Sequence, residues 1–176
     1  DLHSFPTRRS SDLFTCTGTK AYQVTFGNPD FAFIAGRVKF VCLNTNAIEY
    51  DYSQPVPNFD FIKAEWTNRA DEFDRSVVCM HAPPFTEQFN NNVAEPFNDY
   101  IHKLPQLMFC LDGHGHHIRI QDLYDDGTIF YMTASAKERK YYIFTITPDD
   151  YSYEIIDFYH GGRKELHHAS GPYQCQ

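Results

Sequence analysis

The chain has 176 residues, with 15 Lys and Arg against 23 Asp and Glu, and its formal charge of -8 excludes a basic nucleic-acid-binding surface as the default function. Hydrophobic residues make up 42% and charged residues 22%, which indicates a packed core and excludes a disordered chain. The length predicts one domain or part of one, and no apolar stretch approaches the roughly 20 residues of a membrane-spanning helix.

The first thirteen residues, DLHSFPTRRSSDL, show neither strand nor helix periodicity. They resemble the in-frame translation of a widely used short-read sequencing adapter, so we predict a non-native segment at residues 1–13. The domain is then expected at residues 14–160, as the distal part of a longer protein whose upstream sequence is missing. Because any signal peptide would lie upstream, a cytoplasmic and an exported protein are both compatible with the sequence.

The next segments predict a hairpin and a helix. Residues 31–45, FAFIAGRVKFVCLNT, read as two short strands with a turn at Ala35-Gly36. From Asn58 the apolar residues recur at three- and four-residue steps, which predicts an amphipathic helix with Asn58 or Asp60 as its N-cap. The apolar positions of this helix are Phe59, Ile62, Trp66, Ala70 and Phe73.

Two buried strands and a second helix follow. Residues 76–81, SVVCMH, have strand length, and the prolines after Ala82 end the strand because proline cannot donate to a ladder. A weaker helix is predicted at 95–104 and a second apolar strand at 106–111, ended by Asp112-Gly113. This alternation predicts a layered α/β fold.

Beyond His117 the period drops to two. Residues 118–121 and 128–133 predict one antiparallel hairpin, and residues 141–147 and 151–158 predict another. Residues 161–176 carry Gly, Pro and polar residues without a period, which predicts a loosely ordered tail.

The cysteine pattern indicates neither a zinc knuckle nor a complete disulfide framework. The count of five is odd and no CxxC spacing occurs. Cys42, Cys79 and Cys110 each lie inside an apolar run, so we expect them to be buried free thiols.

Candidate ligands gather at the ends of the two buried strands. His81 lies in CMHAPPF, and His114 and His116 lie in LDGHGHH. Both segments place imidazoles at the carboxyl end of an apolar strand, where α/β folds bind ligands. In an extended loop His114 and His116 would project to the same side, and three imidazoles suit Zn, Fe or Mn when carboxylates join them.

The order strand-HAPP, helix, strand-GHGH and antiparallel hairpins resembles the C-terminal half of the calcineurin-like metallophosphoesterases. The earlier FAFIAGRVKFVCLNTN is similar to the family's strand pair. The resemblance implies the distal part of an α-β-β-α sandwich, with mixed sheets and antiparallel hairpins at the C-terminus. It implies hydrolysis of phosphate mono- or diesters, in small-molecule or macromolecular substrates, by two divalent or trivalent ions of Mn, Fe or Zn. His81 and His114 would bind one ion and His116 its neighbour.

The family's DxH, GDxxD and GNH[DE] motifs are absent from the chain. The resemblance therefore places the bridging Asp and the general-acid His in the missing upstream part, and we expect this chain to be inactive. Asp112 and His117 are further candidates that could orient the ligands by hydrogen bonding or face the substrate. Residues 49–58 and 86–94 follow strand ends and are candidate substrate-facing loops.

Two alternative functions are compatible with the same residues. The first is a mononuclear zinc hydrolase or hydratase that uses His81, His114 and His116, since three His plus a water position form a known catalytic arrangement. The second is a non-catalytic binding module whose aromatic surface, from 16 Phe and 12 Tyr, serves a partner or a carbohydrate.

Overall fold

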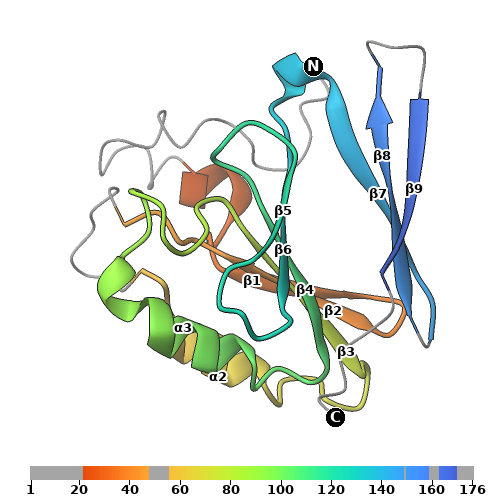
Figure 1. The fold of residues 1–176 in the computed structure, drawn as a ribbon. Coiled ribbons are helices and arrows are strands. Elements are labelled where there is room, and N and C mark those ends of the chain that lie inside the picture. Colours follow the sequence, from red (N-terminus) through yellow and green to blue (C-terminus); the bar gives the residue numbers. More distant parts are fainter. Residues whose placement is uncertain (1–21, 48–55, 149, 159–162, 170–176) are drawn as a thin grey trace.

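The computed structural model describes residues 22–47, 56–148 and 150–158, together with the backbone of residues 163–169. Two sheets and two helices form three layers, with the helices on one face of the larger sheet and the smaller sheet on the other (Figure 1). Residues 22–26 are also helical. The proposed non-native segment at residues 1–13 lies outside the described residues.

The larger sheet has the strand order β1-β2-β3-β4-β6-β5. The inner pairs β2–β3, β3–β4 and β4–β6 are parallel, whereas β1 and β5 run antiparallel at the two edges. The strand bounds are β1 Phe31–Ala35, β2 Val38–Leu43, β3 Arg75–Met80, β4 Leu107–Asp112, β5 Arg119–Asp122 and β6 Ile129–Met132. The mixed sheet and the two predicted hairpins that belong to it are confirmed.

The helices cover one face of this sheet because their apolar sides pack on its buried strands. Helix α2 spans Phe59–Glu65 and α3 spans Ala94–Ile101, preceded by a 3-10 turn η2 at Asn91–Val93. Asn58 is the N-cap of α2, as predicted, and its side chain accepts a hydrogen bond from the backbone N–H three residues on. Both helices connect parallel strands, which places the carboxyl ends of β2, β3 and β4 at one edge.

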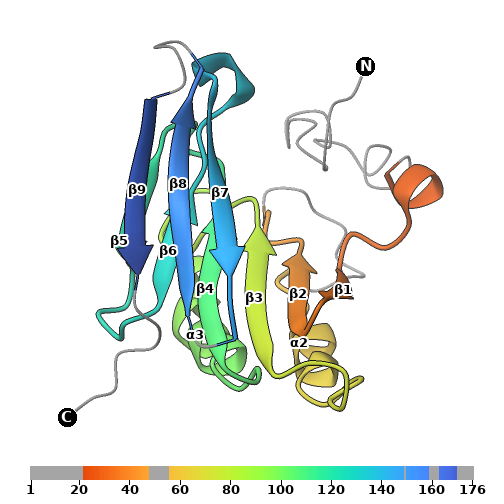
Figure 2. The same ribbon diagram turned by 90° about the vertical axis from the view of Figure 1, so that its right-hand side faces the viewer.

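The smaller sheet is an antiparallel meander in the order β7-β8-β9. Its strands are β7 Lys140–Ile146, β8 Tyr151–Asp157 and β9 Arg163–Ala169, and a 3-10 turn η3 at Ala136–Glu138 precedes them. Figure 2 shows this sheet lying across the β4–β6 side of the larger one. The β7–β8 hairpin is confirmed, but the prediction of a loosely ordered tail is wrong for Arg163–Ala169, whose backbone pairs with the whole of β8.

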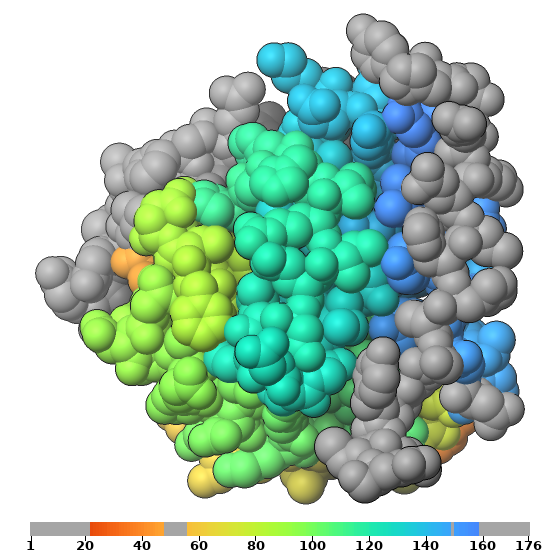
Figure 3. Space-filling model, in the orientation of Figure 1, coloured from red at the N-terminus to blue at the C-terminus, as the bar shows by residue number. Residues whose placement is uncertain are grey.

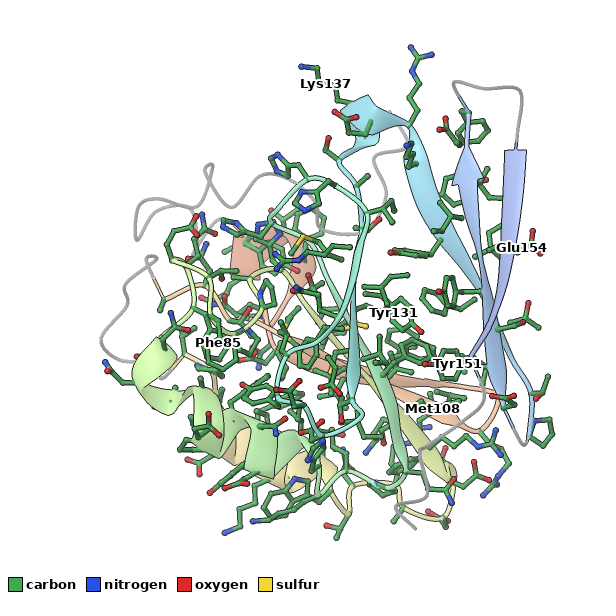
Figure 4. All side chains as sticks on the ribbon, in the orientation of Figure 1. Phe85, Met108, Tyr131, Lys137, Tyr151 and Glu154 are labelled. Atoms are coloured by element: carbon green, nitrogen blue, oxygen red, sulfur yellow. The ribbon has the colours of Figure 1, made fainter. Side chains whose placement is uncertain are left out.

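An aromatic core joins the two sheets. The rings of Phe109 and Phe144 stack at 4.7 Å, and the Tyr131 and Tyr151 hydroxyls are 3.0 Å apart in the buried interface. Figure 4 shows the Tyr131 and Tyr151 side chains extending toward each other between the sheets. The buried rings of Phe109, Tyr131 and Tyr151 therefore serve packing, and they are not available as a binding surface.

Helix α2 ends earlier than the predicted apolar pattern, at Glu65, although apolar spacing continues to Phe73. Buried Lys39 of β2 explains the difference. Its Nζ forms an ion pair with Glu65 Oε2 at 2.8 Å and donates to the backbone carbonyls of Glu65 and Asn68. A cation at these carbonyls favours the end of the helix, and Arg69 then adopts a left-handed φ of 59°.

None of the helices in the described part of the chain is long and apolar enough to cross a membrane.

Candidate functional site

The candidate site lies where β3 and β4 end beside each other. His81 follows the last residue of β3 directly, and His114 comes two residues after β4. Because the two strands are parallel neighbours, both loops emerge at the same edge of the sheet. Figure 3 shows the segments that follow β3 and β4 lying side by side on one face of the molecule.

The structure brings His81 and His114 into contact, as the sequence predicts. Their ring centroids are 5.6 Å apart and the rings are nearly perpendicular, at 83°. The Gly113 N–H donates to the His81 carbonyl at 3.1 Å, and a Cβ on Gly113 would lie 3.3 Å from His81 Nδ1. A glycine at this position therefore permits the close approach of the β4 loop to the imidazole of His81.

The loop that carries His114 and His116 is not extended, which corrects the expected geometry. Both histidines adopt a left-handed backbone, with φ of 64° and 61°, and Gly115 N–H donates to Gly113 O at 2.7 Å. Such a conformation is uncommon for residues other than glycine and is concentrated at functional sites. The extended loop that would project His114 and His116 to the same side is therefore not formed, and of these two rings His114 makes the edge-to-face contact with His81.

Charge and burial keep His81 neutral near physiological pH. Burial lowers the pKa of His81, and the nearby His114 and His116 lower it further by electrostatic repulsion. A neutral imidazole is the form that binds a metal ion. Because His116 contributes to the lowered pKa of His81, it lies close enough to act on His81 electrostatically, although His116 itself is exposed.

Glu87 joins the site, and the sequence reasoning did not single it out. His114 Nε2 donates to Glu87 Oε1 at 2.7 Å, and the pKa of Glu87 is lowered by its backbone N–H and then by His114. A neutral His114 that donates from Nε2 carries its lone pair on Nδ1. A carboxylate on the second ring nitrogen is the common partner of metal-binding histidines. The sequence could have indicated Glu87, because it is the one acidic residue within the candidate loop 86–94.

Hydrogen bonds hold the loop after β3 in place on both sides of Glu87. The Phe85 N–H donates to Asn91 Oδ1 at 2.8 Å, and Asn91 Nδ2 donates to Thr86 O at 2.9 Å. The loop after β2 is bound to the same segment, because Thr45 Oγ1 donates to Ala82 O at 2.7 Å. These hydrogen bonds fix the backbone on either side of Glu87, so they determine where its carboxylate lies.

Asp112, the last residue of β4, is buried, with 5% exposure. Among the described residues its Oδ1 has no hydrogen-bond partner. Burial raises the pKa of Asp112 to about 7, and the positive charge of Arg119 opposes this only in part. A buried carboxyl group with an unused acceptor is a costly feature that a nearby cation would stabilise.

His117 makes a local contact. Its Nδ1 donates to Gly115 O at 2.6 Å, which fixes the ring orientation and, in the neutral ring, leaves the lone pair on Nε2. This bond supports the loop that carries His114 and His116.

The described residues contain no group of three or more His, Cys, Asp or Glu side chains already arranged to hold a metal ion. The side chains at the ends of β3 and β4 nevertheless supply some of the groups that a metal site needs. Two imidazoles meet at ring-contact distance, a carboxylate orients one of them, and a buried carboxyl oxygen lies unused at the same strand end.

Comparison with protein-family models and with curated proteins gives no match. Among solved structures, the fold is similar to that of GAP50, the anchor in the inner membrane complex of Plasmodium. The match has a TM-score of 0.57 and 8% sequence identity, and it covers 81% of this chain and 53% of that chain. The chain thus spans about half the length of that protein. At this identity the similarity shows the fold alone.

Proposed function

We propose that this chain is the distal part of a metal-dependent hydrolase that acts on phosphate mono- or diesters. The observation that carries the proposal is the contact of His81 and His114 at the ends of two adjacent parallel strands, 5.6 Å apart between ring centroids. The resemblance of the HAPP and GHGH segments to calcineurin-like metallophosphoesterases supports the same assignment.

In this proposal His81 and His114 hold one ion and His116 contributes to a second. When bound, a pair of Mn, Fe or Zn ions supplies hydroxide near neutral pH and binds the phosphoryl oxygens. The neutral state of His81 keeps its lone pair available for coordination. Glu87 holds the His114 ring by accepting the Nε2 proton, and Gly113 keeps the two loops close.

The proton that the leaving group needs does not come from these histidines. In the resembled family it comes from the His of the GNH[DE] motif, and the metal-bridging carboxylate comes from GDxxD. Neither motif is present in this sequence. We therefore expect the 176-residue chain to bind metal without measurable turnover, and a parent protein with the upstream motifs to be active.

Metal binding by the purified chain tests the proposal. Equilibrium dialysis against Mn²⁺ and Zn²⁺, followed by elemental analysis, should show binding that His81→Ala and His114→Ala abolish. Glu87→Gln should weaken affinity by about 10-fold or more, since it removes the carboxylate partner of a ligand. His102→Ala is the matched control, because the exposed His102 bonds to Thr128 Oγ1 on another part of the surface.

Two outcomes would overturn the proposal. Equal metal content in wild type, His81→Ala and His102→Ala would show that the histidine pair holds no ion. Metal-dependent hydrolysis of p-nitrophenyl phosphate by the purified chain, with one zinc per molecule, would instead favour the mononuclear zinc hydrolase.

A non-catalytic binding role is the second candidate, because a similar fold occurs in a protein that is described as an anchor. This role predicts that no variant at the histidine pair alters metal content or stability. The dialysis experiment therefore separates the two functions directly.

A further inference from the structure

Two cysteines face each other across neighbouring strands of the larger sheet. Cys42 of β2 and Cys79 of β3 are direct register partners in a parallel pair. Adjacent strands lie about 4.8 Å apart, and disulfides span Cα separations of about 4.4 to 6.8 Å. The backbone therefore already holds the two residues at a separation that a disulfide can bridge.

Their side chains lie on the same face of the sheet. Val41 and Leu43, which flank Cys42, pack in the core beneath the helices, so Cys42 points to the opposite face. Cys79 packs with the residues of that opposite face, next to the core between the sheets. Both thiols are free and only partly buried, which corrects the expectation that they are buried.

Cys110 provides an internal contrast. It is a free thiol with 0% exposure in the helix-side core, and its register partner on β3 is Val78. Burial raises the pKa of Cys110 well above its ordinary value, which makes this thiol unreactive. Three cysteines on adjacent strands thus separate into one facing pair and one isolated residue.

We propose that Cys42 and Cys79 form a redox-active dithiol that hydrogen peroxide converts to a disulfide. The proposal is independent of the proposed function, because it needs only the two thiols. A hydrogen bond from the Cys79 thiol lowers the pKa of Cys42, against the effect of burial, and this favours Cys42 as the attacking sulfur.

The reaction proceeds in two balanced steps. The Cys42 sulfur attacks one peroxide oxygen, the O–O bond breaks, and the released hydroxide takes the thiol proton to form water and a sulfenic acid. The Cys79 sulfur then attacks the Cys42 sulfur and expels hydroxide, which takes the Cys79 proton and leaves as the second water. Two thiols lose two electrons in total, and one peroxide is reduced to two waters.

The sequence allows a direct test, because trypsin places each of the five cysteines in a different peptide. Cys42 lies in residues 40–63, Cys79 in 76–103 and Cys110 in 104–119. The purified chain is treated with hydrogen peroxide, the remaining thiols are alkylated, and the unreduced digest is analysed by mass spectrometry. We expect peptides 40–63 and 76–103 to be joined, with the loss of two hydrogens, and Cys110 to be alkylated.

Matched variants sharpen the result. Cys110→Ser should leave the cross-link yield unchanged, whereas Cys42→Ser should abolish it and leave Cys79 as an alkylated thiol. Full alkylation of Cys42 and Cys79 after peroxide treatment would overturn the proposal. Random pairing among all five cysteines would overturn it as well, because the proposal requires that the sheet register selects the pair.

Discussion

Asp112 should make the stability of the metal-free protein depend on pH. Its folded-state pKa of about 7 lies above the ordinary value of 3.8 because of burial. Between these values the folded protein binds a proton that the unfolded chain does not, so stability falls as pH rises. A pKa unit corresponds to about 1.36 kcal/mol, and the slope is reduced close to each pKa, so the free energy of unfolding should fall by about 3 kcal/mol from pH 4 to pH 7.

Replacing the titrating group should remove this dependence. In Asp112→Asn the slope over that pH range should flatten, and the variant should exceed wild type in stability above about pH 7, where the buried charge is most costly. Urea unfolding in EDTA, followed by fluorescence of the single tryptophan, measures the slope, because Trp66 Nε1 donates to the Tyr100 carbonyl in the fold.

The exposed Asp99 on α3 offers the control variant Asp99→Asn, which should retain the wild-type slope. If the unfolding free energies of wild type and Asp112→Asn run parallel from pH 4 to 7, the reasoning about Asp112 is wrong.

Three further substitutions test the packing around the site by urea unfolding. Lys39→Met should cost about 3–5 kcal/mol, because it leaves the buried Glu65 carboxylate without its cation. Adding Glu65→Leu should restore most of the loss, and an unrestored double variant would contradict this account. Gly115→Ala should cost about 1 kcal/mol, because the new Cβ would collide with Met132 Sδ and the flexible end of that side chain can shift. Met132→Ala should suppress the collision penalty, and equal penalties in both backgrounds would refute the collision. Asn58→Ala should cost about 1 kcal/mol by removing the N-cap bond, and an unchanged midpoint would show that the cap contributes nothing.

The α/β elements followed from local patterns, whereas their ends did not. The strand and helix periods located the three hairpins and both helices, because each face is buried against a neighbouring layer. The length of α2 was overestimated, since its apolar spacing continues to Phe73 while a distant lysine caps the helix at Glu65. The backbone of β9 pairs with β8 although the β9 sequence shows no alternation, because backbone pairing leaves little trace in a polar edge strand.

The candidate site was partly predictable for the same reason. His81 and His114 could be placed together because both follow buried parallel strands. The Glu87 contact was not predictable, since it depends on how Asn91 ties the loop after β3. The left-handed turns at His114 and His116 were also hidden, because no glycine or asparagine marks those two positions.

The hydrogen bond between Tyr131 and Tyr151 has a consequence for how the two sheets are aligned. Stacked rings such as Phe109 and Phe144 tolerate small sliding motions, because dispersion and hydrophobic contacts have little directional preference. A buried pair of hydroxyl groups does not tolerate sliding, since moving one strand by one residue along the other would leave both hydroxyls without a hydrogen-bond partner. The tyrosine pair thus fixes the position of β8 relative to β6, and it selects one alignment of the two sheets from several that aromatic packing alone would allow.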